Sequence, residues 1–233
     1  MLWGGVNDPY NGYEYVDMGD AGIWSKYPIG ITEWNEDWKD NIKYFEWGGI
    51  EGYTASQVGV DKQFSSSFTE YRFSAEGATG TSNPQLTKYC SNSKYGKDGF
   101  TDNLTVLLPE DDACVVNMGG NWRMPITEEF QTLYVLCNNK LVTDYNGVTG
   151  LNGILFTLKT DESKQLFIPN GGCCVNGNLR TGDATFYSSS LDKNGSYPYR
   201  ALGLFFGQLG CAPTYDINRC YGFPVVGFLG SGQ

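Results

Sequence analysis

The chain has 233 residues, of which 18% are charged and 15% are aromatic, and its formal net charge is −10. This acidity argues against partners that need a basic surface, so we expect neither nucleic-acid binding nor attachment to an anionic membrane. Histidine is absent, which removes the commonest general base and the usual zinc ligand from any active site.

The first ten residues are interpreted as a lead-in to a single domain that spans residues 11–233. The N-terminus has neither the basic start nor the apolar segment of a secretory signal peptide, so no signal peptide is expected. No apolar run approaches the roughly 20 residues that cross a bilayer, and membrane insertion is not expected either.

Three short elements are predicted next. Aromatic or apolar residues alternate with acidic or polar ones over residues 13–18 and 23–27, which predicts two strands. Apolar residues then recur at steps of four, four and three between Trp34 and Phe45. This spacing predicts one face of a short helix.

Residues 48–99 have little periodicity and are rich in Ser, Gly, Thr, Asn and Lys. We predict a long irregular insertion with small strands, and a loop of this length inside a compact domain is usually functional or mobile. The aromatic side chains expected to pack it are Tyr53, Phe64, Phe68, Tyr71 and Phe73.

Two central helices are predicted on either side of a tight turn. The first begins at Pro109, has acidic residues in its first turn and ends near Met118. Gly119 and Gly120 allow the turn, and Trp122 supplies a large apolar anchor.

The second central helix has Thr127 as its expected N-cap. Its apolar residues are spaced along one face between Phe130 and Cys137, and Asn138-Asn139 is expected to end it. The Trp122-Arg123 pair between the two helices is interpreted as a structural hinge and not as an active site.

The remaining sequence predicts a sheet. Residues 153–158 and 165–168 form a predicted hairpin, and further strands are predicted over residues 186–190, 201–206 and 220–228. Two central helices with strands around them give an α+β domain.

The seven cysteines are odd in number, and no C-x-x-C pair occurs among them. This spacing fits no zinc pattern and favours scattered buried thiols over a disulfide framework. If one pair forms, Cys211 with Cys220 is the expected one, because it closes a short loop. No metal site is expected.

Residues 119–125, with the sequence GGNWRMP, resemble the G-G-x-W-R-M-P-T element of the Fibrobacter succinogenes major paralogous domain. This family is related in fold to the formylglycine-generating enzymes and to C-type-lectin-like proteins. Other family motifs are resembled, in the same order along the chain, by residues 11–19, 44–48, 110–113, 166–169, 187–190 and 218–223. The resemblance covers most of the chain and implies a C-type-lectin-like fold.

The chain departs from the family pattern at several positions. Ile126 stands where Thr is usual, and Tyr187 stands where Trp is usual. Asn170 and Gly171 replace two alanines, and Val226 stands where an arginine is common. The changes at Pro224 and Val226 bear on the geometry of the last strand and leave the expected fold unchanged.

Within this family, the chain most resembles variable proteins of diversity-generating retroelements from gut Bacteroides and their phages. Such proteins display changeable residues on a ligand-binding face, and the resemblance implies that residues 186–228 form this variable region here. Leu204 and Phe206 are expected to hold the scaffold. The residues expected to form the ligand-binding face are Leu202, Gly203, Phe205, Gly207, Gln208, Leu209, Gly210, Ala212, Pro213, Thr214, Tyr215, Asp216, Ile217 and Phe223.

The resemblance implies a non-enzymatic protein that recognises a protein or glycan receptor on a bacterial surface, without a cofactor. Its expected location is a virion or a bacterial cell surface. One alternative is a structural virion or cell-surface scaffold protein that has no ligand of its own. A second alternative is a degenerate enzyme of the formylglycine-generating type.

The residue chemistry bears on these alternatives. Residues 207–217 have mostly short side chains between two predicted strands, which suits a binding loop but also an ordinary surface connection. Ile168 occupies the place of the carboxylate in the Glu-Pro-Asn calcium motif of C-type lectins, so no such calcium site is expected. Residues 110–112 are interpreted as an acidic helix start rather than a cation site. Cys173-Cys174 has no basic neighbour closer than Arg180 to lower a thiol pKa, and catalysis is not expected.

Overall fold

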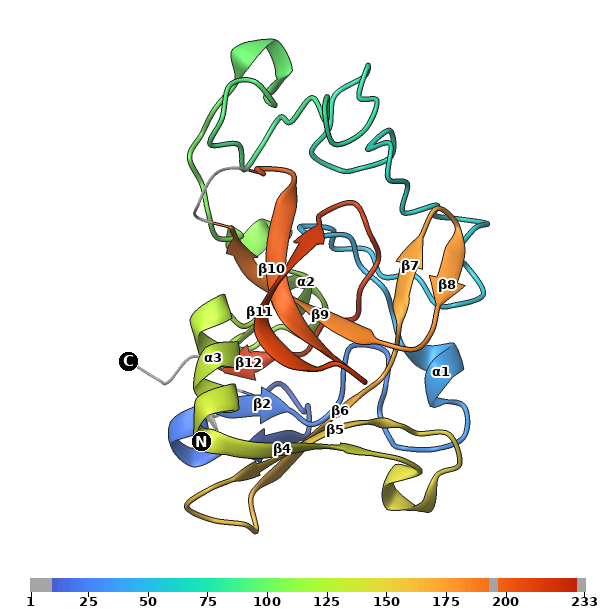
Figure 1. Ribbon diagram of the computed structural model, residues 1–233, viewed down its shortest axis with the longest axis vertical. Coiled ribbons are helices and arrows are strands. Elements are labelled where there is room, and N and C mark those ends of the chain that lie inside the picture. Colours follow the sequence, from blue (N-terminus) through green and yellow to red (C-terminus); the bar gives the residue numbers. More distant parts are fainter. Residues whose placement is uncertain (1–9, 193–196, 230–233) are drawn as a thin grey trace, which may run out of the picture.

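Short antiparallel strands dominate the computed structural model, which describes residues 10–192 and 197–229 (Figure 1). Within these residues a single helix, α3 (Thr127–Leu136), is longer than six residues. The predicted α+β class is therefore confirmed. Residues 1–9 of the predicted lead-in lie outside the described residues, as do residues 230–233 at the end of the predicted domain.

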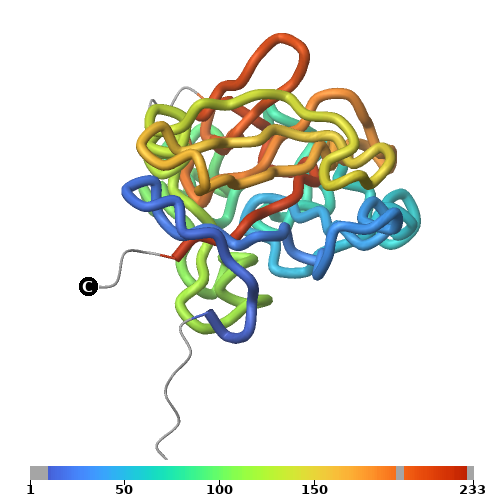
Figure 2. Tube along the Cα trace, turned by 90° about the horizontal axis from the view of Figure 1, so that it is seen from below, coloured from blue at the N-terminus to red at the C-terminus, as the bar shows by residue number. Residues whose placement is uncertain are grey.

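One sheet joins the two ends of the described chain. Its strand order is β1 (Tyr15–Asp17), β2 (Ile23–Ser25), β12 (Phe228–Leu229) and β3 (Trp122–Arg123), all antiparallel. The two predicted N-terminal strands are confirmed with shorter bounds. Figure 2 shows the red C-terminal segment beside the blue N-terminal one, as this strand order requires.

The predicted strand over residues 220–228 is wrong for all but its last residue. The preceding residues run through the core as irregular backbone that bonds to several different segments. Phe223 pairs with Phe45, and Gly222 pairs with Cys174, each as an isolated bridge. The segment is apolar because it is buried, and burial alone does not produce a continuous strand ladder.

A second sheet has the order β4 (Cys137–Val142), β5 (Gly153–Leu158) and β6 (Gln165–Pro169). The predicted hairpin of β5 and β6 is confirmed. The chain leaves α3 after Leu136 and enters β4 directly, so the predicted helix end at Asn138-Asn139 is wrong. These asparagines are exposed on an edge strand, where no apolar alternation marks the strand in the sequence.

A third sheet contains the region predicted to bind ligand. Its order is β11 (Gly210–Asn218), β10 (Arg200–Gly207) and β9 (Ala184–Leu191), and the hairpin of β7 (Cys173–Val175) and β8 (Asn178–Arg180) precedes it in the chain. β9 and β10 confirm the predicted strands. The predicted binding loop over residues 207–217 is wrong, because a turn at Gln208 and Leu209 leads directly into β11. Gly210 and Pro213, which are uncommon in strands, conceal β11 in the sequence.

The N-terminal predicted helix is reduced to α1 (Trp38–Asn41), a single turn. The apolar residues after it leave the helix to pair elsewhere, as the bridge between Tyr44 and Tyr53 shows. The first central helix is also shorter than predicted: a 3-10 turn, Pro109–Asp111, precedes α2 (Ala113–Met118). The predicted end of this helix at Met118 is confirmed.

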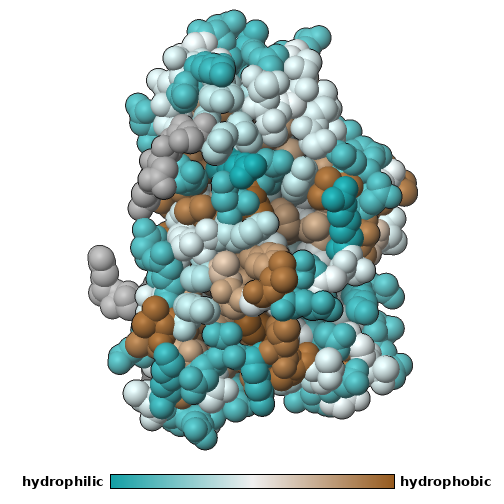
Figure 3. Space-filling view, viewed as in Figure 1, coloured by the Kyte–Doolittle hydropathy of each residue, from teal (hydrophilic) through white to brown (hydrophobic). Residues whose placement is uncertain are grey.

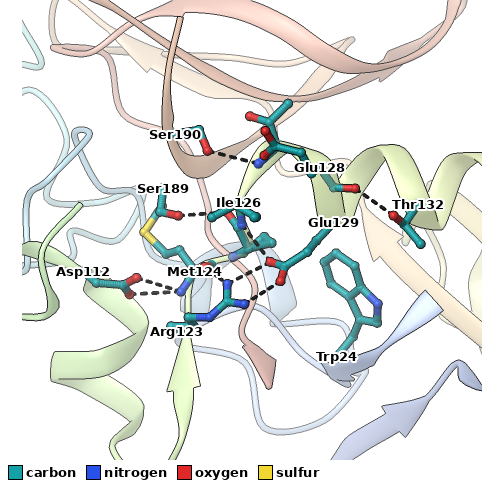
Figure 4. Close-up of polar contacts among 12 residues, drawn as sticks. Trp24, Asp112, Arg123, Met124, Ile126, Glu128, Glu129, Thr132, Ser189 and Ser190 are labelled. Atoms are coloured by element: carbon teal, nitrogen blue, oxygen red, sulfur yellow. Dashed lines mark hydrogen bonds and ion pairs between the residues drawn. The ribbon is translucent and has the colours of Figure 1, made fainter. Parts of the chain in front are cut away.

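The junction between α2 and α3 is a short strand, β3, which hydrogen bonds and an ion pair hold in place, so it is not a hinge (Figure 4). The buried Asp112 carboxylate accepts hydrogen bonds from Cys114 N at 2.8 Å, which caps α2, and from Met124 N at 2.9 Å. Glu129 pairs with Arg123 and also accepts from Ile126 N at 2.8 Å. These contacts hold the end of β3 against the first turns of both helices.

The predicted N-cap of α3 is wrong by one residue. Ile126 occupies the N-cap position with extended backbone, and Thr127 is the first helical residue. Glu129 accepts from Ile126 N, as the glutamate of a capping box does, while Glu129 N donates to the backbone oxygen of Ile126 at 3.1 Å instead of to an N-cap side chain. The Thr127 hydroxyl lies 3.0 Å from the Ser188 hydroxyl instead, which joins α3 to β9.

Residues 48–99 form the predicted irregular insertion, which isolated bridges rather than regular strands hold in place. Tyr53 is partly exposed, while the other predicted aromatic anchors are buried: Phe64, Phe68, Tyr71 and Phe73. Three of these belong to the same core cluster as Tyr187 of β9 and Ile217 of β11. The insertion, coloured cyan to teal at the right and top of Figure 1, is therefore packed onto the third sheet.

Candidate functional site

The predicted ligand-binding residues fall on β10, on β11 and on the turn between them. Leu204 and Phe206 are fully buried, as predicted for scaffold residues. The exposed members of the predicted set are Gln208, Leu209, Gly210, Thr214 and Tyr215, and the partly exposed members are Leu202, Phe205, Ala212, Pro213 and Asp216.

The remaining four members, Gly203, Gly207, Ile217 and Phe223, are buried. The predicted display of Gly203 and Gly207 is wrong, whereas Ile217 and Phe223 line the groove described below although little of their surface is exposed. A Cβ added to Gly203 would lie 2.3 Å from Phe186 O, and therefore this glycine is part of the packing between β9 and β10. Ile217 and Phe223 belong to the core cluster. Register shifts on both sides of Gly203 break the simple alternation on which the prediction depended.

A groove of about 430 Å³ opens beside β10 and β11. This volume lies within the range of ordinary small-ligand sites. Five of the predicted residues line the groove, together with residues from β7, β8 and β9. The complete lining is Cys173, Val175, Arg180, Asp183, Thr185, Arg200, Phe205, Tyr215, Asp216, Ile217, Asn218, Tyr221 and Phe223.

The middle of the groove is aromatic. The ring centroids of Phe205 and Tyr215 are 4.7 Å apart, with the planes tilted by 30°. Phe205 lies opposite Ala212 on β11 and opposite Thr185 on β9, which places small neighbours on both sides of its ring. Figure 3 shows a brown, hydrophobic area in the middle of this face of the molecule, with teal, hydrophilic residues around it.

One end of the groove holds an ion pair between two strands. Arg200 Nη1 lies 2.9 Å from Asp216 Oδ2, and the Arg200 guanidinium also stacks over the rings of Tyr197 and Tyr199, 5.2 and 5.8 Å from their centroids. Burial lowers the pKa of Arg200, but the hydrogen bond to Asp216 and the charge interactions with Asp216, Tyr199 and Tyr197 together outweigh burial and raise the pKa overall. The guanidinium of Arg200 therefore stays charged across the physiological pH range.

Polar atoms at this end have unused hydrogen-bonding capacity. Arg200 Nε, Asp216 Oδ1 and Asn218 Oδ1 are shielded from solvent, and none of them has a hydrogen-bond partner among the described residues. Buried polar atoms without partners are uncommon in folded proteins. Three such atoms beside one groove show that this end is polar and that some of its hydrogen-bonding atoms are unpaired.

The other end of the groove carries Arg180, at the end of β8, and Asp183, just before β9. Both residues are exposed, and neither side chain makes a hydrogen bond or an ion pair within the described part of the chain. The hydroxyl groups of Thr185 and Tyr215 likewise have no hydrogen-bond partner there. The groove thus combines an aromatic middle with free donors and acceptors at its rim.

Arg180, Asp183 and Thr185 are site residues that sequence reasoning missed, as are Arg200 and Asn218 at the opposite end of the groove. The first three lie 16 to 21 residues before the predicted strand over residues 201–206, and tertiary packing brings them to the groove, Arg180 from the end of β8 and Asp183 and Thr185 from the start of β9. A charged pair just before a predicted strand was the one available signal, and it has no specific meaning by itself.

The thiols near the groove are not activated for nucleophilic chemistry. Burial raises the pKa of the Cys173 thiol and raises that of Cys211 to about 11. All seven cysteines are free, so the pair considered between Cys211 and Cys220 does not form. A catalytic cysteine needs the opposite shift, towards the thiolate at neutral pH.

The described residues contain no group of three Cys, Asp or Glu side chains arranged to hold a metal ion. They also contain no helix that is long and apolar enough to cross a membrane. Comparison of the chain with protein-family models, with curated proteins and with solved structures gave no match. The groove and the motif resemblance are therefore the two features of the chain that bear on its function.

Proposed function

We propose that the chain is a non-enzymatic ligand-binding protein that recognises a receptor on a bacterial surface through the groove. In this proposal the scaffold is C-type-lectin-like, and the protein is a retroelement-diversified variable protein of a gut phage or of Bacteroides, at a virion or cell surface. The family part of the proposal is supported by the motif resemblance alone.

The observation that carries the proposal is the agreement between two independent assignments. The motif resemblance indicates β10 and β11 as the binding region, and the structure forms a groove there. Phe205, Tyr215 and Asp216 belong to both assignments and have exposed surface in the groove. Aromatic side chains of this kind contribute much of the binding energy in recognition surfaces.

The position of β11 suits a variable surface. β11 is the edge strand of the third sheet, and its backbone is held by the ladder to β10 irrespective of its side chains. Thr214 and Tyr215 are exposed on it. Substitutions at such surface positions usually change stability by only about 0.5 kcal/mol, so binding residues can vary while the fold persists.

The first prediction tests the groove as the binding site. The triple substitution of Phe205, Tyr215 and Asp216 to Ala is expected to leave the protein folded and to abolish its capture of Bacteroides cell envelopes. Circular dichroism and thermal melting measure the fold, and a pull-down measures the binding. The matched control is Tyr134→Ala, because this tyrosine is 38% exposed and does not line the groove.

Two outcomes would contradict this prediction. A triple variant that is folded and still binds would place the ligand face elsewhere, and an unfolded variant would assign the three side chains to the core. The retroelement assignment has a separate test in the genome. It requires a reverse-transcriptase gene beside a near-copy of the DNA that encodes residues 186–228.

A further inference from the structure

The aromatic middle of the groove is an open platform for a flat, partly apolar group. Tyr215 is 44% exposed, and Phe205 lies against it with a centroid separation of 4.7 Å. The face of an aromatic ring carries negative potential and attracts the weakly positive C–H groups of a ligand. A ligand ring that has one C–H face matches this surface.

The rim of the groove needs a ligand that both donates and accepts hydrogen bonds. Arg180 offers only donors, Asp183 offers only acceptors, and the hydroxyl groups of Thr185 and Tyr215 offer both. None of these groups has a hydrogen-bond partner within residues 10–192 and 197–229. A ligand with several hydroxyl groups around a ring can satisfy all of these side chains at once.

The charge of the groove is balanced although the chain has a net charge of −10. Two arginines, Arg180 and Arg200, and two aspartates, Asp183 and Asp216, line it. This balance gives no net attraction for an anionic or a cationic group, and it favours a neutral one. The volume of about 430 Å³ fits a small ring, whereas a protein partner commonly buries about 800 Å² on each side of a flatter contact.

We infer that the groove binds a neutral saccharide. The sugar ring stacks on Phe205 and Tyr215, while its hydroxyl groups bond to Arg180, Asp183 and Thr185. This inference rests on the proposed function and specifies a glycan, rather than a protein, as the receptor. Recognition of this kind uses side chains alone, so it requires no calcium ion.

The test uses the full chain, an array of neutral bacterial polysaccharides, and Bacteroides cell envelopes. Binding to the array is expected to persist in EDTA. Envelope binding is expected to survive proteinase K and to disappear after periodate, which cleaves vicinal diols of sugars. Tyr215→Ala and Arg180→Ala should each weaken binding about tenfold or more, as expected for residues at the centre of a contact.

The controls separate binding from folding. Tyr134→Ala and Lys140→Ala remove one exposed tyrosine and one exposed lysine that do not line the groove, and they should bind as the wild type does. Tyr215→Phe keeps the aromatic platform and removes only the hydroxyl group, so its binding should lie between those of the wild type and Tyr215→Ala. Circular dichroism of each variant confirms its fold.

The possible contrary results have distinct meanings. Envelope binding that is lost with proteinase K and survives periodate would overturn the saccharide inference and retain the proposed function. Saccharide binding that is unchanged in both Tyr215→Ala and Arg180→Ala would exclude the groove as its site and overturn the inference. A wild-type protein that binds neither the array nor untreated envelopes would overturn the proposed function as well.

Discussion

Trp122 links distant parts of the chain through a single side chain. It is 1% exposed, its Nε1 donates to Tyr10 O at 2.7 Å, and its backbone pairs with Leu229. Gly227 leaves the space in which the indole packs, since an added Cβ would lie 2.9 Å from Trp122 Cε3. The apolar anchor that the sequence indicated is therefore the contact at which the two ends of the described chain meet.

The second prediction follows from this burial. Trp122→Ala is expected to lower the free energy of unfolding by about 3–5 kcal/mol, because it leaves a large cavity and removes the hydrogen bond to Tyr10. Urea denaturation followed by fluorescence and circular dichroism measures the change. Tyr134→Ala, a substitution of an exposed aromatic residue, should differ from the wild type by only about 0.5 kcal/mol. A loss of less than about 1 kcal/mol in Trp122→Ala would show that the indole contributes little.

At the scale of elements, Asp112 couples two of them, α2 and β3, with one carboxylate. It caps α2 through Cys114 N and Val115 N, and it also accepts from Met124 N just after β3. A cap contributes about 0.5–2 kcal/mol, and a buried N–H without a partner costs about 1–3 kcal/mol. Both effects act at this position, and so the junction is more sensitive than an ordinary helix start.

The third prediction compares two substitutions of this residue. Asp112→Ala is expected to lower the free energy of unfolding by about 2–4 kcal/mol, because it removes the cap and leaves Met124 N unsatisfied. Asp112→Asn keeps an acceptor oxygen and should lose less than half of that amount. Chemical denaturation of the two variants provides the measurement. Equal losses in both would mean that the charge of the carboxylate, and not its acceptor geometry, holds the junction.

The same elements show how far the sequence determined the structure. The β5–β6 hairpin, β9 and β10 could be predicted because long apolar or β-branched runs mark them. β11 could not, because Gly210 and Pro213 occur in it, and β4 could not, because it is exposed. The apolar residues 220–227 predicted a strand, but their hydrogen bonds go to segments far away in the sequence, which no local pattern reveals.

The candidate site was predictable in part for a similar reason. Tyr215 and Asp216 could be assigned to it because motif order located the binding region. The burial of Gly203 and Gly207 could not be foreseen, since it depends on Phe186 O and on Asp183 lying against them. Arg180 at the groove rim comes from the β7–β8 hairpin and Asp183 from the segment just before β9, and only tertiary packing determines that neighbourhood.

At the scale of the whole molecule, the insertion over residues 48–99 is joined to the C-terminal region through Arg219. This side chain is 0% exposed, Nη2 donates to Tyr89 O at 2.7 Å, and the guanidinium lies 5.2 Å from the centroid of the Trp47 ring. No carboxylate lies within ion-pair distance of it in the described residues, and Nε and Nη1 have no hydrogen-bond partner there. A carbonyl and an aromatic face therefore stabilise the buried charge.

The last prediction concerns Arg219→Met, which keeps most of the volume and removes the charge. Burying an arginine with two unsatisfied nitrogens costs free energy in the folded state. Removing this charge should therefore offset much of the free energy lost with the Tyr89 and Trp47 contacts, and the melting temperature should change little. Locally, Tyr89 O loses its donor and Trp47 loses its cation, and amide hydrogen exchange should therefore rise across residues 71–90. Exchange in β5 and β6 should stay as in the wild type, because these strands belong to a different core cluster.

Lys140→Met, at an exposed lysine, is the matched control. Uniformly faster exchange throughout the chain would contradict a local role, and unchanged exchange in the insertion would show that Arg219 does not anchor it.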